Sequence, residues 1–162
     1  MGCAAIGPAG GGPEDKNGPS LININPSIGS LNLPPNQKIN ISFSEPLDPN
    51  SVQAAIQINS DNKTDIITRK NSIIISPIEP WKNEKIIRIN LDRNIRDYQG
   101  NSMESPIDII FSTSSELYNG KISGQLVNYD NKNIYELGLF KYSRKDSLKL
   151  LFKTQLNNLG EF

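Results

Sequence analysis

Two short stretches of alternating residues limit this chain to a fold built largely of strands. In residues 39–43 and 87–91 every second residue is Ile, Leu or Phe, and the residues between them are polar or charged. Side chains of a strand point alternately to its two faces, so each stretch would bury one face and leave the other polar. Both stretches therefore predict half-buried β-strands.

Runs of this kind recur from residue 19 to residue 113, and clusters of Pro, Asn, Asp, Gly and Ser separate them. Short apolar runs between turn residues, at intervals of about 8–12 residues, are typical of all-β domains. The chain therefore predicts an all-β fold, a β-sandwich of about seven strands, although the strand count alone leaves a closed barrel open. The predicted strands are residues 21–24, 38–43, 56–59, 64–68, 72–76, 86–91 and 107–112.

One helical turn is predicted within this pattern, at residues 48–56. Asp48 or Asn50 can cap a helix, and Pro49 suits the first helical position. The following Ala54-Ala55 pair tolerates helical backbone. We expect this turn to connect the two sheets of the sandwich.

Charge and composition exclude several classes of function. The chain has 17 basic and 17 acidic residues, no histidine and a single cysteine among 162 residues. A balanced charge gives no broad field that attracts nucleic acid, and no apolar run approaches the roughly 20 residues of a spanning helix. Ser-His-Asp and Cys-His arrangements cannot form, and a zinc site would lack its usual ligands. We therefore predict no cofactor, no metal site and no nucleic-acid partner.

The first 18 residues predict a flexible leader. They contain Gly2, then Cys3, and then a run rich in Gly, Pro and Ala that has no apolar periodicity. A Gly-Cys pair ahead of such a leader resembles the start of mature bacterial lipoproteins with Ig-like domains. The resemblance implies a lipid on Cys3, attachment to a membrane through that lipid, and a place in the cell envelope at the outer membrane. An ordinary free thiol near the start of the chain is the alternative.

Three motifs within residues 19–113 resemble bacterial Ig-like domains of the SbsA type. Residues 39–48 are I-N-I-S-F-S-E-P-L-D, residues 95–101 are I-R-D-Y-Q-G-N, and residues 110–113 are I-F-S-T, with Ile where the family has its first Phe. The motifs follow the order found in the family. The resemblance implies an Ig-like sandwich that serves as a spacer or adhesion module and carries no catalytic residues.

Acidic residues near the turns are candidate functional residues. Glu45 and Asp48 each precede a proline, where the chain leaves strand geometry, so we expect their carboxylates to accept backbone N–H bonds. Asp97 and Asn101 flank Gly100, which is free to adopt positive φ, and they predict a second turn of the same kind. The alternative for Glu45 and Asp48 is an acid/base pair for glycoside cleavage.

A calcium site is a further alternative at the second turn. Asp92, Asp97, Asn101 and Glu104 offer oxygen donors within one short loop, and oxygen donors are the ligands that calcium prefers. Their spacing matches no EF-hand loop. Turn structure is therefore the favoured interpretation of these residues.

The only tryptophan, Trp81, follows Pro80 in a proline-rich stretch. An exposed tryptophan there would be able to stack on a sugar. In a small β domain, however, a tryptophan beside prolines more often closes one end of the core. We therefore predict a buried Trp81.

The remaining residues predict a second, smaller β module after a polar linker at residues 114–119. Strands are expected at 120–130, 135–142 and 148–154, and residues 157–162 should form a hairpin turn that opens another strand. The run G-K-I-S-G-Q-L-V at residues 120–127, followed by Lys153-Thr154 and Gly160-Glu161-Phe162, resembles the first part of a carboxypeptidase regulatory-like, transthyretin-like module. The resemblance implies the fold only. About 43 residues, from 120 to 162, predict an incomplete module.

A cluster of charged and aromatic residues at 141–145 would be able to bind a polyanion. The balanced charge of the chain favours a solvated hairpin instead.

Two hypotheses for function follow from these observations. The first is a non-enzymatic cell-envelope lipoprotein whose Ig-like domain is a spacer, adhesion or interaction module with a protein or glycan partner at the cell surface. The second is a non-catalytic accessory region of a larger secreted enzyme that degrades glycans or peptides.

Overall fold

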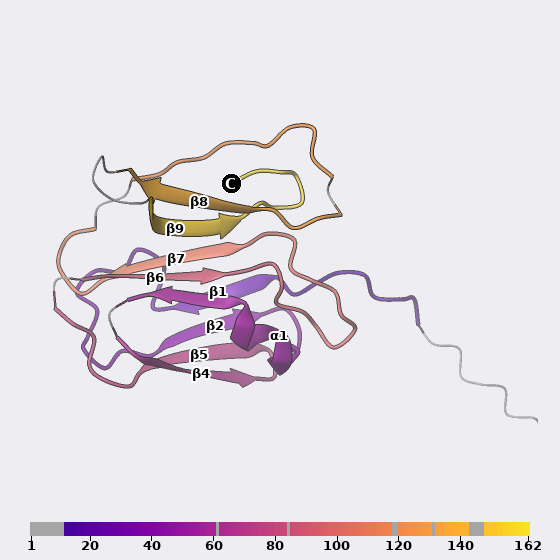
Figure 1. Ribbon diagram of the computed structural model, residues 1–162. Coiled ribbons are helices and arrows are strands. Elements are labelled where there is room, and N and C mark those ends of the chain that lie inside the picture. The colour runs from indigo at the N-terminus through magenta and orange to yellow at the C-terminus, as the bar shows by residue number, and fades with distance from the viewer. Residues whose placement is uncertain (1–11, 61, 84, 118–119, 131, 143–147) are drawn as a thin grey trace, which may run out of the picture.

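A computed structural model describes residues 12–60, 62–83, 85–117, 120–130, 132–142 and 148–162 of the chain. Within these residues the fold is all-β with one short helix (Figure 1). The elements are β1 (Leu21–Asn25), β2 (Ile39–Phe43), α1 (Pro49–Ala54), β3 (Ile56–Asn59), β4 (Thr64–Arg69), β5 (Ser72–Pro77), β6 (Ile86–Leu91), β7 (Ile107–Ser112), β8 (Glu136–Lys141) and β9 (Lys149–Gln155).

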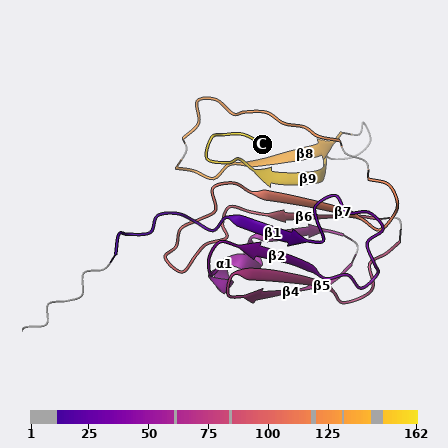
Figure 2. The same ribbon diagram turned by 180° about the vertical axis from the view of Figure 1, so that it is seen from behind.

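The first seven strands form two facing antiparallel sheets, which confirms a sandwich rather than a barrel. One sheet has the order β1-β2-β5-β4 and the other has the order β3-β6-β7. The β8-β9 hairpin lies on the outer side of the three-stranded sheet, and Figure 2 shows the same stacking from behind. All seven strands predicted between residues 21 and 112 are therefore confirmed, to within one or two residues at their ends.

The core lies between the two sheets because alternate residues of the central strands point inward. Ile39 and Ile41 of β2 are 0% exposed, and Ile87 and Ile89 of β6 are 1% exposed. Removing one such side chain from water contributes about 1.5–3 kcal/mol, so this alternating pattern is what holds the sandwich together. The other buried apolar side chains of the two sheets are Ile24, Phe43, Ile73, Ile75, Leu91, Ile109 and Phe111.

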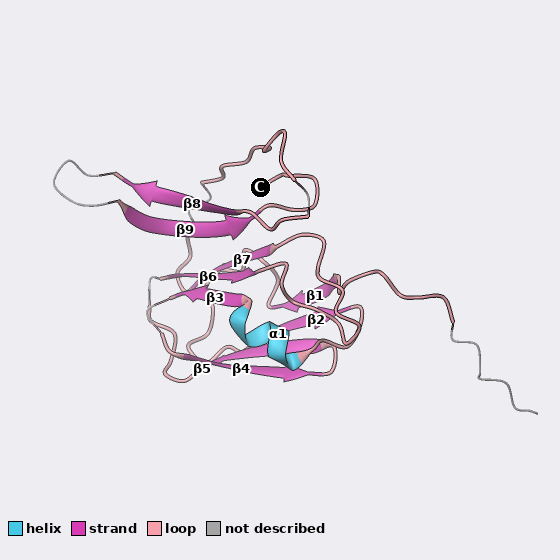
Figure 3. Cartoon of the chain, turned by 45° about the vertical axis from the view of Figure 1, so that its right-hand side comes forward, coloured by secondary structure: helices cyan, strands magenta, loops and turns pink. Residues whose placement is uncertain are grey.

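The predicted helical turn is confirmed as α1. Asp48 is its N-cap, and the Asp48 carboxylate accepts a hydrogen bond of 3.0 Å from the backbone N–H of Asn50. Pro49 is tolerated at the first position because the N–H that it lacks would have no helical partner there. Figure 3 shows that α1 leads from the end of β2 to β3, and thus from one sheet to the other.

The second module agrees only in part with the prediction. The hairpin strands are present as β8 and β9, but the strand predicted at residues 120–130 is wrong. That segment forms only an isolated bridge between Gln125 and Glu161. The strand predicted to follow the turn near residue 160 is likewise represented only by this bridge. The two segments exchange backbone hydrogen bonds only around Gly124 and Phe162 and between Leu126 and Gly160, too few for a ladder.

Candidate interaction site

The predicted lipid attachment residue, Cys3, lies outside the described residues. The end of the leader is described, and it contacts the sandwich at the turn around Asn101. The Asn101 side chain donates a hydrogen bond of 3.1 Å to the backbone carbonyl of Asp15. Gly18 lies against Ser102 so closely that a Cβ atom at residue 18 would be 2.0 Å from the Ser102 carbonyl oxygen. The chain therefore enters the sandwich through a contact that admits only glycine at this position.

Asp97 organises the turn that receives the leader; the sequence predicted the turn but not the contact with the leader. Its carboxylate accepts hydrogen bonds of 2.8 Å from the backbone N–H and from the side-chain amide of Asn101. Gly100 has a φ of 90°. Burial opposes the charged carboxylate, but these hydrogen bonds and those from the backbone of Gly100 and Gln99 outweigh it, so the pKa of Asp97 lies below its ordinary value.

Glu45 belongs to a group of three carboxylates at this turn. Oxygen atoms of Asp15, Glu45 and Asp97 lie within 4.8 Å of one another. Burial, followed by the nearby charges of Asp97 and Asp15, raises the pKa of Glu45. The charged form of Glu45 is therefore disfavoured at this turn.

The structure does not assemble the alternative sites that the sequence left open. The described residues contain one group of three or more acidic side chains close enough to hold a metal ion, and it includes neither Asp92 nor Glu104. The described residues therefore give the four-residue calcium hypothesis no support. Asp48 is engaged as the cap of α1 while Glu45 lies beside Asp97, so the geometry offers no support for a catalytic pair of Glu45 and Asp48.

Trp81 closes the end of the core, as predicted, and is not available to stack on a sugar. Its side chain is 2% exposed. The indole Nε1–H donates a hydrogen bond of 2.8 Å to the carbonyl of Gln37, and the backbone N–H of Trp81 donates to the carbonyl of Pro35. The ring thus joins the segment before β2 to the segment after β5.

Arg93 connects the sandwich to the second module. Its backbone N–H donates a hydrogen bond of 2.9 Å to the side-chain oxygen of Gln155 in β9. The Arg93 guanidinium donates to the carbonyls of Met103 and Leu156, both at 3.3 Å. Gln155 and Leu156 are each 1% exposed, so this contact is sealed from water.

We call residues 92–104 the junction loop, because three parts of the chain meet there. The leader contacts it at Asn101 and Ser102, and β9 contacts it at Arg93. The carbonyl of Glu104 also accepts a hydrogen bond of 3.3 Å from the backbone N–H of Asn158. The sequence indicated the turn at residues 97–101, but nothing around Arg93 or Gln155 marked a contact between modules.

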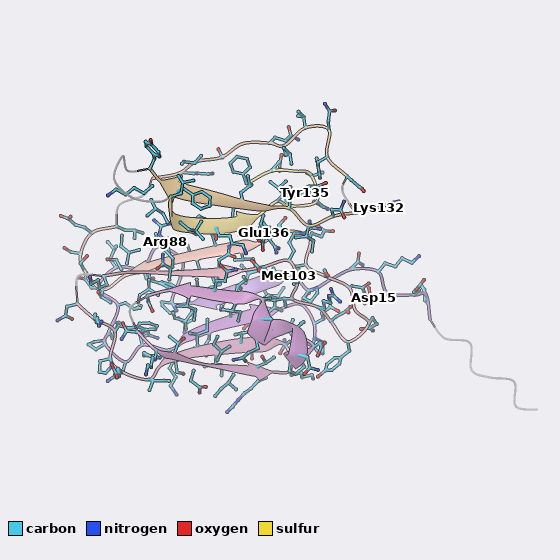
Figure 4. All side chains as sticks on the ribbon, in the orientation of Figure 1. Asp15, Arg88, Met103, Lys132, Tyr135 and Glu136 are labelled. Atoms are coloured by element: carbon cyan, nitrogen blue, oxygen red, sulfur yellow. The ribbon has the colours of Figure 1, made fainter. Side chains whose placement is uncertain are left out.

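The hairpin covers a polar surface of the three-stranded sheet. Lys153 of β9 forms an ion pair of 2.6 Å with Glu136 of β8. The guanidinium of Arg88 lies 5.8 Å from the centroid of the Phe152 ring, a cation–π contact. Arg88 and Glu136 occupy the layer between the hairpin and the sheet (Figure 4).

Asp92 lies at the edge of this layer and is 5% exposed. Burial raises its pKa, and the negative charges of Glu136 and Asp108 act in the same direction. Lys153 and a hydrogen bond from Gln57 act in the opposite direction but do not compensate. The layer thus holds an acid whose charged form is disfavoured.

Two clefts open between the sandwich and the second module. The larger, of about 1230 Å³, lies between β7, the hairpin and residues 120–123. The smaller, of about 260 Å³, lies between the outer face of β3 and β6 and residues 150–153 of the hairpin. Lys141 and Tyr142 are exposed, as expected for a solvated hairpin, and residues 143–145 of the predicted basic cluster lie outside the described residues.

In the described part of the chain, α1 is far too short to cross a lipid bilayer, and no other helix there is long and apolar enough.

A comparison with curated protein sequences found no match. Among solved structures, similarity extends to the LD transpeptidase LdtMt1 in complex with imipenem, at 15% identity and a TM-score of 0.38, over 57% of this chain and 38% of that one. It also extends to an L,D-transpeptidase from Mycobacterium smegmatis, at 11% identity and a TM-score of 0.44, over 86% of this chain and 73% of that one. The present chain thus spans well under half of the first of these proteins.

A family model gives the more informative comparison. The model of the bacterial Ig-like domain matches residues 15–113, which is more than half of the chain. The matched segment begins at Asp15, where the leader first contacts the junction loop, and ends just after β7. On this match, and with the two-sheet sandwich described above, the protein belongs to the family of bacterial Ig-like domains.

Proposed function

We propose that this protein is a non-enzymatic lipoprotein of the cell envelope, held at the outer membrane by a lipid on Cys3. Its Ig-like domain is a spacer and interaction module that carries the second β module, a carboxypeptidase regulatory-like unit, away from the membrane. Its partner is a protein or a glycan at the cell surface.

The junction loop is the observation that supports the spacer role. A spacer holds its two ends in a fixed relation only if both connections resist bending. Here the leader is fixed by Asn101 and by the close packing of Gly18, and the second module is fixed by Arg93 and Glu104. Both connections lie on one short segment, residues 92–104, which is itself held by the buried Asp97.

The lipid anchor is supported by the leader sequence, and it is tested by mass spectrometry. The protein would be expressed behind its native upstream sequence in a bacterial host, next to a Cys3→Ser control. We expect an N-terminal peptide that begins at Cys3 and carries diacylglycerol, and no such peptide from the control. An unmodified thiol at Cys3 would contradict the anchor and leave the spacer role to be judged separately.

The spacer role is tested by the distance between two spin labels, placed in a Cys3→Ser background at Gln53 of α1 and Lys141 of β8. Both side chains are exposed. We expect one narrow distance distribution, because the junction loop joins the two modules. A broad distribution in the otherwise unaltered protein would contradict a rigid spacer.

A further inference from the structure

The outer face of the three-stranded sheet carries a row of polar side chains. In the strand register, Gln57 of β3 is opposite Asn90 of β6, and Asn90 is opposite Asp108 of β7. Because the neighbouring Ile89 and Leu91 point into the core, Asn90 points away from it. Outward positions of a sandwich strand are normally polar, so the row itself is ordinary, and what requires explanation is the burial of one of its members.

Asn90 is the unusual member of this row. Its side chain is 4% exposed, and its amide nitrogen donates a hydrogen bond of 2.6 Å to the Asp108 carboxylate. A charged carboxylate can only accept hydrogen bonds, so the Asn90 amide must direct its nitrogen toward Asp108 and its oxygen away from Asp108. That oxygen, Oδ1, is buried and has no hydrogen-bond partner. Buried acceptors are nearly always paired, so Asn90 lacks a donor.

Asn90 lines the smaller cleft, of about 260 Å³, whose walls differ in character. One wall comes from the hairpin and is apolar at Leu150, Leu151 and Phe152. The other wall comes from β3 and β6. The hairpin residues Leu150 and Leu151 are 48% and 44% exposed, so these two lining residues are not packed into a core.

Charges of both signs surround the cleft and give it little preference for an ion. Arg88 and Lys153 line it, and Asp108 lies directly behind Asn90. The buried Asp92 contributes a second acid close to Lys153. A neutral molecule with several groups that both donate and accept hydrogen bonds suits such a surface better than an anion or a cation does.

We propose that this cleft binds one unit of a neutral saccharide. A sugar hydroxyl donates to Asn90 Oδ1, which requires the side chains that cover this buried atom to move aside, and the same hydroxyl accepts from the Arg88 guanidinium or the Lys153 ammonium. The apolar C–H face of the pyranose ring covers Leu151 and Phe152. A single water would satisfy Asn90 but would leave the apolar wall exposed, which is why a sugar fits both walls better. The inference names the partner class of the interaction module and so rests on the proposed function.

An NMR titration of the full 162-residue chain tests the proposal. The probes are cellotriose, maltotriose, laminaritriose and N-acetylchitotriose, each added to millimolar concentration, and a capped peptide of alternating Val and Thr. We expect at least one saccharide to shift the signals of Gln57, Arg88 and Asn90 in a saturable way. No saturable shift with any saccharide would overturn the proposal. A peptide that shifts these signals when no saccharide does would overturn it in favour of a protein strand.

Two variants show whether the row itself binds. Asn90→Leu removes the unpaired acceptor, and Arg88→Met removes a donor while it keeps an apolar stem over Phe152. We expect each to weaken binding by at least about tenfold. Asn40→Leu makes the same exchange on the outer face of β2 in the other sheet and should bind as the unaltered protein does. Full binding by a folded Arg88→Met variant would contradict the proposed contacts, even if Asn90→Leu failed to fold.

Binding in solution does not depend on a lipid. Acylation of Cys3 without saccharide binding would leave the envelope lipoprotein standing and remove the saccharide site. Saccharide binding without acylation of Cys3 would support the saccharide site and contradict the lipid anchor.

Discussion

The backbone N–H of Arg93 and the side-chain oxygen of Gln155 are joined by a hydrogen bond of 2.9 Å across 62 residues of sequence. Gln155 is 1% exposed, so the bond is shielded from water and joins the second module directly to the sandwich. Arg93 adds a second link, from its guanidinium to the carbonyl of Leu156. Arg93 thus makes two of the contacts that hold the second module on the sandwich, beside the hydrogen bond from Asn158 to Glu104 and the contact of Arg88 with Phe152.

Replacing Gln155 by Ala should release the hairpin from the sandwich. The change leaves the Arg93 N–H buried without a partner, which costs about 1–3 kcal/mol. Hydrogen exchange should accelerate at β8 and β9 while the amides of β2 and β6 keep their protection. Gln53→Ala, at an exposed position of α1, is the matched control and should leave hydrogen exchange unchanged in both modules. Equal acceleration in both modules would show that the contact supports the whole fold rather than the junction.

Replacing Gly18 by Ala should displace the leader from the junction loop. The added Cβ would be 2.0 Å from the carbonyl oxygen of Ser102, so one of the two backbones must move, at a cost of about 1–3 kcal/mol. Limited proteolysis should then cut residues 12–20 faster. Gly12→Ala is the control, because nothing lies within 4 Å of a Cβ at that position. Identical cleavage rates for the two variants would contradict the packing described for Gly18.

Asp97 should make stability depend on acid pH. Its folded-state pKa is lowered, so the charged carboxylate contributes stability that is present above the unfolded-state pKa of about 3.9 and is lost as pH falls through the folded-state pKa. At pH 7 we expect Asp97→Asn to lower the free energy of unfolding by about 1.5–3 kcal/mol, the range of hydrogen bonds to charged groups. Thermal melts at decreasing pH should show a smaller difference in stability between Asp97→Asn and the unaltered protein. Asp65→Asn, at an exposed position of β4, should show no such trend.

Asp92 should have the opposite dependence. Its folded-state pKa is raised, mainly by burial, so the protonated acid is favoured and stability falls as pH rises through that pKa. Asp92→Asn imitates the neutral form and should melt at an equal or higher temperature at pH 7. The advantage should shrink as the pH falls through the folded-state pKa and should disappear below the unfolded-state pKa of about 3.9. A variant that melts lower at pH 7 would show that the attraction of Lys153 for the charged form outweighs burial.

Trp81 should report on the closed end of the core. Because it is the only tryptophan and is 2% exposed, its emission should be blue-shifted and poorly quenched by iodide. Trp81→Phe keeps most of the apolar volume but leaves the Gln37 carbonyl without its donor. We expect a loss of about 1–3 kcal/mol in urea unfolding. Strong quenching in the folded protein would contradict the buried position.

The sandwich was predictable from the amino-acid sequence, because the patterns that specify it are local. Alternation in Ile39–Phe43 and Ile87–Leu91 sets which face of each strand is buried, and Asp48 with Pro49 sets where α1 begins. The turn at Asp97 was also predictable, since its partner Asn101 is only four residues away. Such patterns survive in the sequence because each depends on residues that are close together along the chain.

The contacts between the leader, the sandwich and the hairpin became visible only in the folded chain. Arg93 is hydrogen-bonded to Gln155, Gly18 packs against Ser102, and Asn90 lines a cleft beneath the hairpin. Each of these contacts depends on how segments that are distant in the sequence pack together. The segment at residues 120–130 looked like a strand because it has strand composition, but strand pairing needs a long partner, and it meets only residues 160–162. Composition along one segment says which conformations are favourable there, whereas a contact also requires a partner that only the folded chain supplies.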